Sequence, residues 1–118
     1  MKRVFKKLFQ TGIPQSLDKK AHEKIKHIYG TADGEYGPNL FVEHHLDALD
    51  AEDWEKAIGV PSPTEKEILE SLILINSWSQ DDDETIDTFD FGLPNDISDY
   101  VISVVFNGDQ ITEIVMES

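Results

Sequence analysis

The chain has 118 residues, of which 39% are hydrophobic, so it has room for one compact domain with its own core. It contains no cysteine, which excludes a disulfide scaffold, a thiolate zinc site and a cysteine nucleophile. The longest apolar run, Leu72 to Ile75, is far shorter than the ~20 residues that a bilayer requires. With no signal-peptide pattern at its start, the chain is predicted to be cytoplasmic, without a membrane partner.

The charge is divided unevenly along the chain, whose net charge is -14. Residues 1–27 carry eight of the ten Lys and Arg, whereas residues 28–118 carry two Lys and 22 carboxylates, a net charge of -20 (2 − 22). Such a body repels nucleic-acid phosphates and attracts a basic protein surface. The basic segment is expected to pair with this acidic body, and contact with nucleic acid or anionic lipid is the alternative.

Two helices are predicted in the basic first segment. The apolar residues of 4–9 recur at helical spacing with Lys and Arg on the other face, and Gly12 and Pro14 end that pattern. A second helix is predicted over residues 17–29, with Ser16 as its N-cap and a glycine at its end.

Three further helices are predicted beyond a loop at residues 31–37 that carries two glycines. The first runs from Pro38 or Asn39 through Leu49, and Asp50 caps the next, which Gly59 ends. In the third, Ser62 is predicted as the N-cap, Pro63 as the first helical residue and Glu65 as the third, and the helix continues to about Glu70.

The last third of the chain changes from a helical period to the period of two that is typical of strands. Strands are predicted over residues 71–79, 86–91, 100–106 and 111–116, with a tight hairpin at Asn107-Gly108. The third strand is expected to be central and buried on one face. That face is predicted to consist of Tyr100, Ile102, Val104 and Phe106, packed against Leu46, Trp54, Ile58 and Ile68 of the helices.

These elements predict an α+β fold in which N-terminal helices pack on one face of a four-stranded antiparallel meander. The chain is predicted to be a single domain over 1–118, made of a basic helical segment (1–30), helices (38–70) and the antiparallel sheet (71–118).

The runs Phe41 to Leu46, Phe89 to Phe91, Asp99 to Phe106 and Ile114 to Ser118, in this order and spacing, carry a family resemblance. Over residues 38–118 the chain resembles the small bacterial uncharacterised family called domain of unknown function two thousand and four. The resemblance implies an α+β fold and a bacterial, cytoplasmic setting, and it implies no particular activity. Residues 1–37 depart from that family, whose members begin with a β-rich segment.

Glu43, His44 and His45 form the one cluster with metal-type ligands. Adjacent histidines point about 100° apart on a helix, and zinc helices place histidines at i and i+4. The favoured interpretation is therefore that His45 packs against the sheet while His44 is solvated, and that no metal or other cofactor is bound. A metal-dependent enzyme or metal-binding protein built on these three residues is the alternative.

An acidic run, Asp81 to Glu84, lacks the alternating ligands and the turn glycine of a calcium loop, and it is predicted to be a solvated turn. No phosphate loop, nucleophile elbow or serine triad spacing is present, so catalytic residues are not predicted.

The leading hypothesis is a non-catalytic protein-binding module, such as an inhibitor or immunity-type protein that covers a basic partner. An accessory subunit that docks through a sheet edge or helix face is a further alternative. The candidate partner-binding residues are Asp47, Asp50, Glu52, Asp53, Asp81, Asp82, Asp83 and Glu84.

Overall fold

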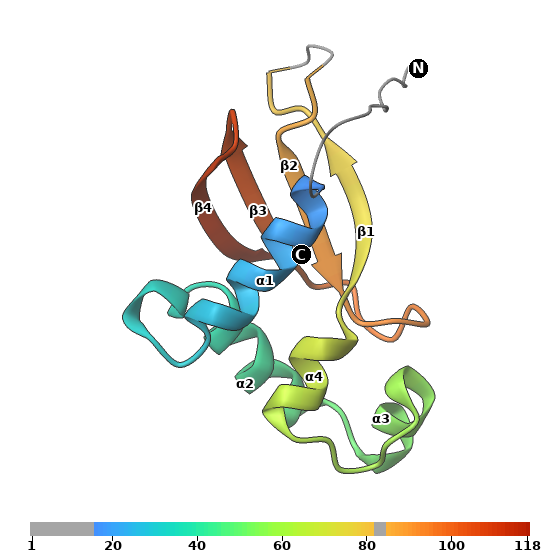
Figure 1. The fold of residues 1–118 in the computed structure, drawn as a ribbon. Helices are drawn as coiled ribbons and strands as arrows, with labels where there is room; N and C mark the ends of the chain where they lie inside the picture. Colours follow the sequence, from blue (N-terminus) through green and yellow to red (C-terminus); the bar gives the residue numbers. More distant parts are fainter. Residues whose placement is uncertain (1–15, 82–84) are drawn as a thin grey trace.

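The computed structural model describes residues 16–81 and 85–118 (Figure 1). Its elements are α1 (Leu17–Ile28), a 3-10 turn η1 (Ala32–Gly34), α2 (Pro38–Ala48), α3 (Ala51–Ile58), α4 (Glu65–Ser71), β1 (Ile73–Trp78), β2 (Thr88–Gly92), β3 (Val101–Asn107) and β4 (Gln110–Glu117). The strands form one antiparallel sheet in the order β1-β2-β3-β4. The predicted α+β meander is confirmed. The helix predicted over residues 4–9 lies outside the described residues.

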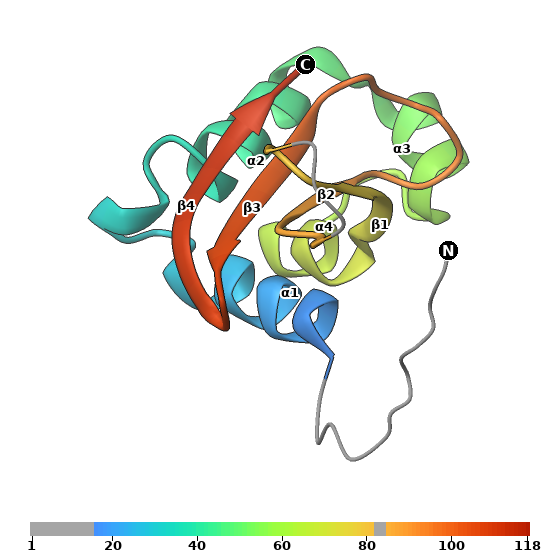
Figure 2. The ribbon, with the colours of Figure 1, turned by 90° about the horizontal axis from the view of Figure 1, so that it is seen from above.

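Helices α1 and α2 pack against the sheet and α4 adds to the same core, whereas α3 lies farther from the strands (Figures 1 and 2). Helix α1 contacts β2, and α2 contacts β3 and β4. The core between the two layers contains Ile102, Val104 and Phe106 of β3 beside Phe89 and Phe91 of β2. The predicted burial of β3 is thus confirmed for three residues, and Tyr100, which precedes the strand, is half-buried.

Leu46 contradicts the predicted packing, because its side chain is 42% exposed. Helix α2 turns Phe41, Val42 and His45 toward the core instead, and all three are buried. Since Leu46 follows His45 directly, it lies about 100° around the helix, which places it at the surface.

Two helices begin with a capping box. Asp50 caps α3 as predicted, and Gly59 ends that helix in the left-handed conformation with φ 79°. Helix α4 begins two residues later than predicted, because its N-cap is Thr64 and not Ser62. The Thr64 hydroxyl accepts from the Glu67 N–H at 3.1 Å, and the Glu67 carboxylate accepts from the Thr64 N–H at 2.8 Å.

The strand boundaries differ from the predicted ones mainly at β1. Leu72, predicted to lie in the strand, follows α4 and is buried, and all six residues of β1 are exposed. The predicted hairpin at Asn107-Gly108 is confirmed, with Asn107 paired to Gln110 and Gly108 at φ 67°. Among the described helices, none is long and apolar enough to cross a membrane.

Candidate functional site

Four of the predicted partner-binding carboxylates lie together where α2 meets α3. Asp47 is near the end of α2, Asp50 caps α3, and Glu52 and Asp53 occupy its first turn. Asp47, Asp50 and Glu52 are exposed and Asp53 is half-buried. We call this region the α2–α3 corner, defined by residues 46–54 and 61–63.

Two of these carboxylates also hold the backbone of the corner. The Asp53 N–H donates to the Asp50 carboxylate at 2.9 Å, and the Asp50 N–H donates to the Asp53 carboxylate at 3.2 Å. The bond from the Asp53 N–H lowers the pKa of Asp50, so the cap is fully ionised at neutral pH. The side chains of Asp47 and Glu52 have no part in the cap, and the Glu52 carboxylate lies 4.0 Å from the Lys56 ammonium.

Asp81, the one described residue of the predicted acidic run, lies at the opposite end of the molecule from the α2–α3 corner. Asp81 is exposed in the connection between β1 and β2, whereas Asp82, Asp83 and Glu84 lie outside the described residues. Figure 1 places this connection at the top and α3 at the bottom, beyond the helical layer. The structure therefore brings together the four carboxylates of the α2–α3 corner and separates them from Asp81.

A hollow lies beside the carboxylates of the α2–α3 corner, lined mainly by apolar residues although about half of its surface is polar. It has a volume of about 310 Å³ and is lined by Leu46, Leu49, Ala51, Trp54, Pro61, Ser62 and Pro63. Leu46 is exposed at its rim, and Trp54, at 3% exposed, belongs to the core. This hollow was not predicted, because Leu46 was assigned to the core and Ser62 and Pro63 to a helix start.

Most carboxylates of the described chain have no cationic partner. Of the 24 Asp and Glu residues, all but the three at 82–84 are described. Within those described residues, just Glu23, Glu52 and Glu70 lie within 4.0 Å of a lysine nitrogen. Lys26, in the basic first segment, does pair with Glu70 of α4 at 3.2 Å. The cations of the described residues therefore compensate little of the negative charge of the body.

His45 is buried at 1% exposed, and both of its ring nitrogens have partners. Nδ1 lies 2.8 Å from the Phe41 carbonyl oxygen, which can only accept, so Nδ1 carries the hydrogen. Nε2 then accepts from the Ser98 hydroxyl at 2.7 Å. Burial lowers the pKa of His45, which keeps the ring neutral and this tautomer fixed.

The His45–Ser98 bond fastens the connection between β2 and β3 to α2. The Ser98 hydroxyl also accepts from the Tyr100 N–H at 3.1 Å, and the Asn95 amide donates to the Lys56 carbonyl at 3.0 Å. Asn95 and Asp96 have φ values of 66° and 55°, a left-handed turn between these two attachments. The connection thus links α2 to α3 and fixes the orientation of the α2–α3 corner.

The predicted alternative metal ligands do not converge. The His44 ring packs against Tyr100 with a centroid distance of 4.4 Å. His44 is therefore half-buried, whereas the sequence predicted a solvated side chain. Glu43 is exposed, and both nitrogens of His45 are already engaged. Over residues 16–81 and 85–118, no three His, Asp or Glu side chains are placed to hold an ion.

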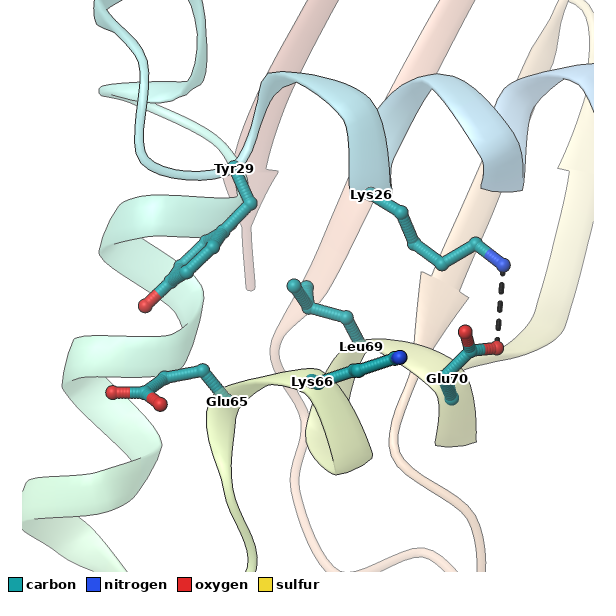
Figure 3. A pocket seen from close by; sticks show the side chains of 6 residues that line it. All are labelled: Lys26, Tyr29, Glu65, Lys66, Leu69 and Glu70. Carbon is teal, nitrogen blue, oxygen red and sulfur yellow. Dashed lines mark hydrogen bonds and ion pairs between the residues drawn. The ribbon is translucent and has the colours of Figure 1, made fainter.

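A hollow of about 420 Å³ lies between α1 and α4 (Figure 3). Lys26, Tyr29, Glu65, Lys66, Leu69 and Glu70 line it. Burial and the Glu65 carboxylate raise the pKa of Tyr29, so its hydroxyl stays a neutral phenol. Figure 3 shows Lys26 directed at Glu70, so the charges in this hollow partly neutralise one another.

Strand β1 carries an exposed apolar surface, which we call the β1 patch. It consists of Ile73, Leu74, Ile75, Trp78 and Ile86, each between 39% and 50% exposed. The sequence analysis missed this patch, because the apolar alternation of residues 71–79 predicted a packed strand.

Comparisons with protein-family models, with curated proteins and with solved structures give no match for this chain. Membership of the bacterial family that residues 38–118 resemble therefore stays a prediction.

Proposed function

We propose that the protein is a non-catalytic binding module that uses the α2–α3 corner to bind a basic protein partner, in the manner of an inhibitor or immunity-type protein. The observation that carries this proposal is the hollow of about 310 Å³ beside four carboxylates of the same corner, of which Glu52 has a described lysine, Lys56, at 4.0 Å. Protein interfaces often combine a central apolar anchor with a charged rim. A partner residue such as Leu or Met would fill the hollow, with Lys or Arg beside it.

Electrostatics supports the same class of partner. Residues 28–118 have a net charge of -20 (2 − 22), which steers a basic surface toward the protein and repels nucleic acid. The attachments of Ser98 and Asn95 hold α2 and α3 in place, so the corner is formed before the partner arrives. A preformed site loses less conformational freedom on binding.

The test is a charge reversal at the corner, Asp47→Lys with Glu52→Lys, which leaves the Asp50–Asp53 cap intact. The matched control is Asp33→Lys with Glu35→Lys, two exposed carboxylates on and beside the η1 turn. Both double variants change the net charge equally. Affinity capture from cells is compared for the full-length protein and both variants, and the association rate of the captured partner is then measured against salt concentration.

We expect the unchanged protein and the control to retain a basic protein that the corner variant loses. Raising the salt from low to physiological concentration should slow association about tenfold or more and change dissociation less. Capture of acidic proteins or nucleic acid alone, equal losses in both variants, or an association rate indifferent to salt would each contradict the proposal.

A further inference from the structure

The β1 patch is an edge strand without the usual protection. Natural edge strands carry charges, prolines or bulges that prevent pairing with another chain. Strand β1 pairs with β2 on one side, and its six residues, Ile-Leu-Ile-Asn-Ser-Trp, include no charge and no proline. A bulge between Leu74 and Asn76 is its one protective feature. Several large apolar side chains on such an edge favour a covering segment.

The helical layer leaves this part of the sheet open. Helix α1 contacts β2 and α2 contacts β3 and β4, whereas every residue of β1 is exposed. Ile75 lies over Gly92 of β2, because a Cβ at Gly92 would be 3.1 Å from its Cγ1 atom. The β1 patch therefore continues from the edge onto the adjoining part of the sheet.

The described chain begins near the β1 edge of the sheet, on the face that the helices cover. Helix α1 starts at Leu17, and Figures 1 and 2 both place its first turn on the β1 side of the sheet. Further along α1, His22 stacks on Phe91 at 5.6 Å, and Phe91 is the cross-strand neighbour of Leu74. Fifteen residues precede Ser16. Fully extended, they reach about 50 Å, which is more than the longest dimension of the molecule, 42 Å.

The composition of residues 1–15 complements the β1 patch. The segment has five large apolar residues after Met1 and four cations, and it has no carboxylate. The large apolar residues are Val4, Phe5, Leu8, Phe9 and Ile13.

Three carboxylates lie at the Trp78 end of the β1 patch and complement the cations of the segment in sign. Asp90 accepts from the Trp78 indole N–H at 3.0 Å, and Asp87 accepts from the Gln80 N–H at 3.2 Å. Asp81 is exposed nearby. Further along the basic first segment, Lys26 already pairs with the acidic body.

We propose that residues 1–15 of the same chain dock on the β1 patch. Their apolar side chains cover Ile73, Ile75 and Trp78, and their cations lie beside the carboxylates of Asp81 and Asp90. The covalent connection to α1 makes this docking intramolecular, which gives it a high effective concentration. This inference does not depend on the α2–α3 corner, which lies at the other end of the molecule.

Acrylamide quenching of tryptophan fluorescence tests the proposal in the full-length protein. Trp54 is 3% exposed, so quenching reports mainly on Trp78, whose side chain is 39% exposed. The test variant is Phe5→Ser with Leu8→Ser, and the matched control is Gln10→Ser with Gln15→Ser. Both variants change residues outside the described core. The midpoint of global thermal unfolding should therefore be the same in all three proteins, and this measurement serves as the folding control.

We expect the quenching constant of the test variant to rise about twofold over that of the unchanged protein, because the indole becomes accessible. The Gln10→Ser, Gln15→Ser control should match the unchanged protein. Amide hydrogen exchange at residues 73–78 should become faster in the test variant alone.

Equal quenching and equal exchange in all three proteins would overturn the proposal, because the β1 patch would then be open to an external partner. Protection that increases with protein concentration would also overturn it, since a second copy would then be the occupant. The corner variant should lose partner capture and keep normal protection of Trp78. Capture reports on the α2–α3 corner and quenching reports on the β1 patch, so each proposal can fail without the other.

Discussion

Strands β3 and β1 have similar apolar residues in opposite surroundings. Ile102 and Val104 of β3 are 0% exposed, whereas Ile73 and Ile75 of β1 are 45% and 50% exposed. Strand β3 lies between β2 and β4 under the helical layer, and β1 ends the sheet. The difference shows that position in the sheet, more than apolar composition, decides what an isoleucine contributes to stability.

Truncation of one isoleucine in each strand is the strongest test of this comparison. Ile102→Ala should lower the free energy of unfolding by about 2–5 kcal/mol, because it leaves a cavity in a filled core. Ile75→Ala should lower it by less, because Ile75 lies on the edge strand, where a docked segment covers it from one side only, whereas Ile102 lies inside a filled core. Urea unfolding of both variants measures the two values. Equal losses would show that β1 is covered as completely as β3.

Adjacent histidines of α2 repeat the comparison between buried and exposed positions. His45→Ala should cost about 1–3 kcal/mol of unfolding free energy, because the Ser98 hydroxyl and the Phe41 carbonyl both lose their partner. His44→Ala removes a ring contact with Tyr100 and no described hydrogen bond, so it should cost less. Thermal unfolding of the two variants gives the order, and a larger loss for His44→Ala would contradict the assigned roles.

The pH dependence of stability sharpens the comparison of the two histidines. Burial lowers the pKa of His45, so the folded state binds fewer protons than the unfolded state as the pH falls through about 6.5. The stabilising contribution of neutral His45 is therefore present above that pH and is lost as the pH falls toward the folded pKa. Unfolding measured from neutral to mildly acidic pH should show a steeper loss in the unchanged protein than in His45→Gln. His44→Gln, the matched control, should keep the steep loss.

Sequence patterns predicted the elements of this fold and failed where distant parts of the chain decide the surroundings. The period of two and the Asn107-Gly108 turn were sufficient to predict the hairpin of β3 and β4, because both signals lie within a short stretch of sequence. The exposure of β1 depends on the sheet order and on where the helices end, and no local pattern encodes either. The sequence of a single strand therefore predicts which side chains alternate between its two faces, but it does not predict whether the strand is central or at the edge of the sheet.

The functional surfaces show the same limit. Asp47 and Glu52 are close in sequence, so their grouping was predictable, as was the capping role of Asp50. The bond from His45 to Ser98 spans 53 residues, and the sequence analysis did not single out Ser98. The hollow forms because residues 61–63 lie beside the end of α2. This arrangement was not predicted, because the start of α4 was predicted two residues too early.

The start of α4 offers the smallest and most local test, because it compares two exposed hydroxyls of which one caps a helix and the other does not. Thr64 accepts from the Glu67 N–H at 3.1 Å, whereas Ser62, two residues earlier, is exposed and caps no helix. Thr64→Ala should therefore lower the free energy of unfolding by about 1 kcal/mol, the usual effect of removing an N-cap hydroxyl. Ser62→Ala removes a hydroxyl of the same kind and should change stability by less than about 0.5 kcal/mol. Ser62 also lines the hollow of the α2–α3 corner. The Ser62→Ala variant therefore distinguishes an effect on partner binding from an effect on stability. A variant that keeps its stability and weakens partner binding would place Ser62 in the interface, whereas a loss of stability at Ser62 with none at Thr64 would mean that α4 begins where the sequence pattern alone had placed it.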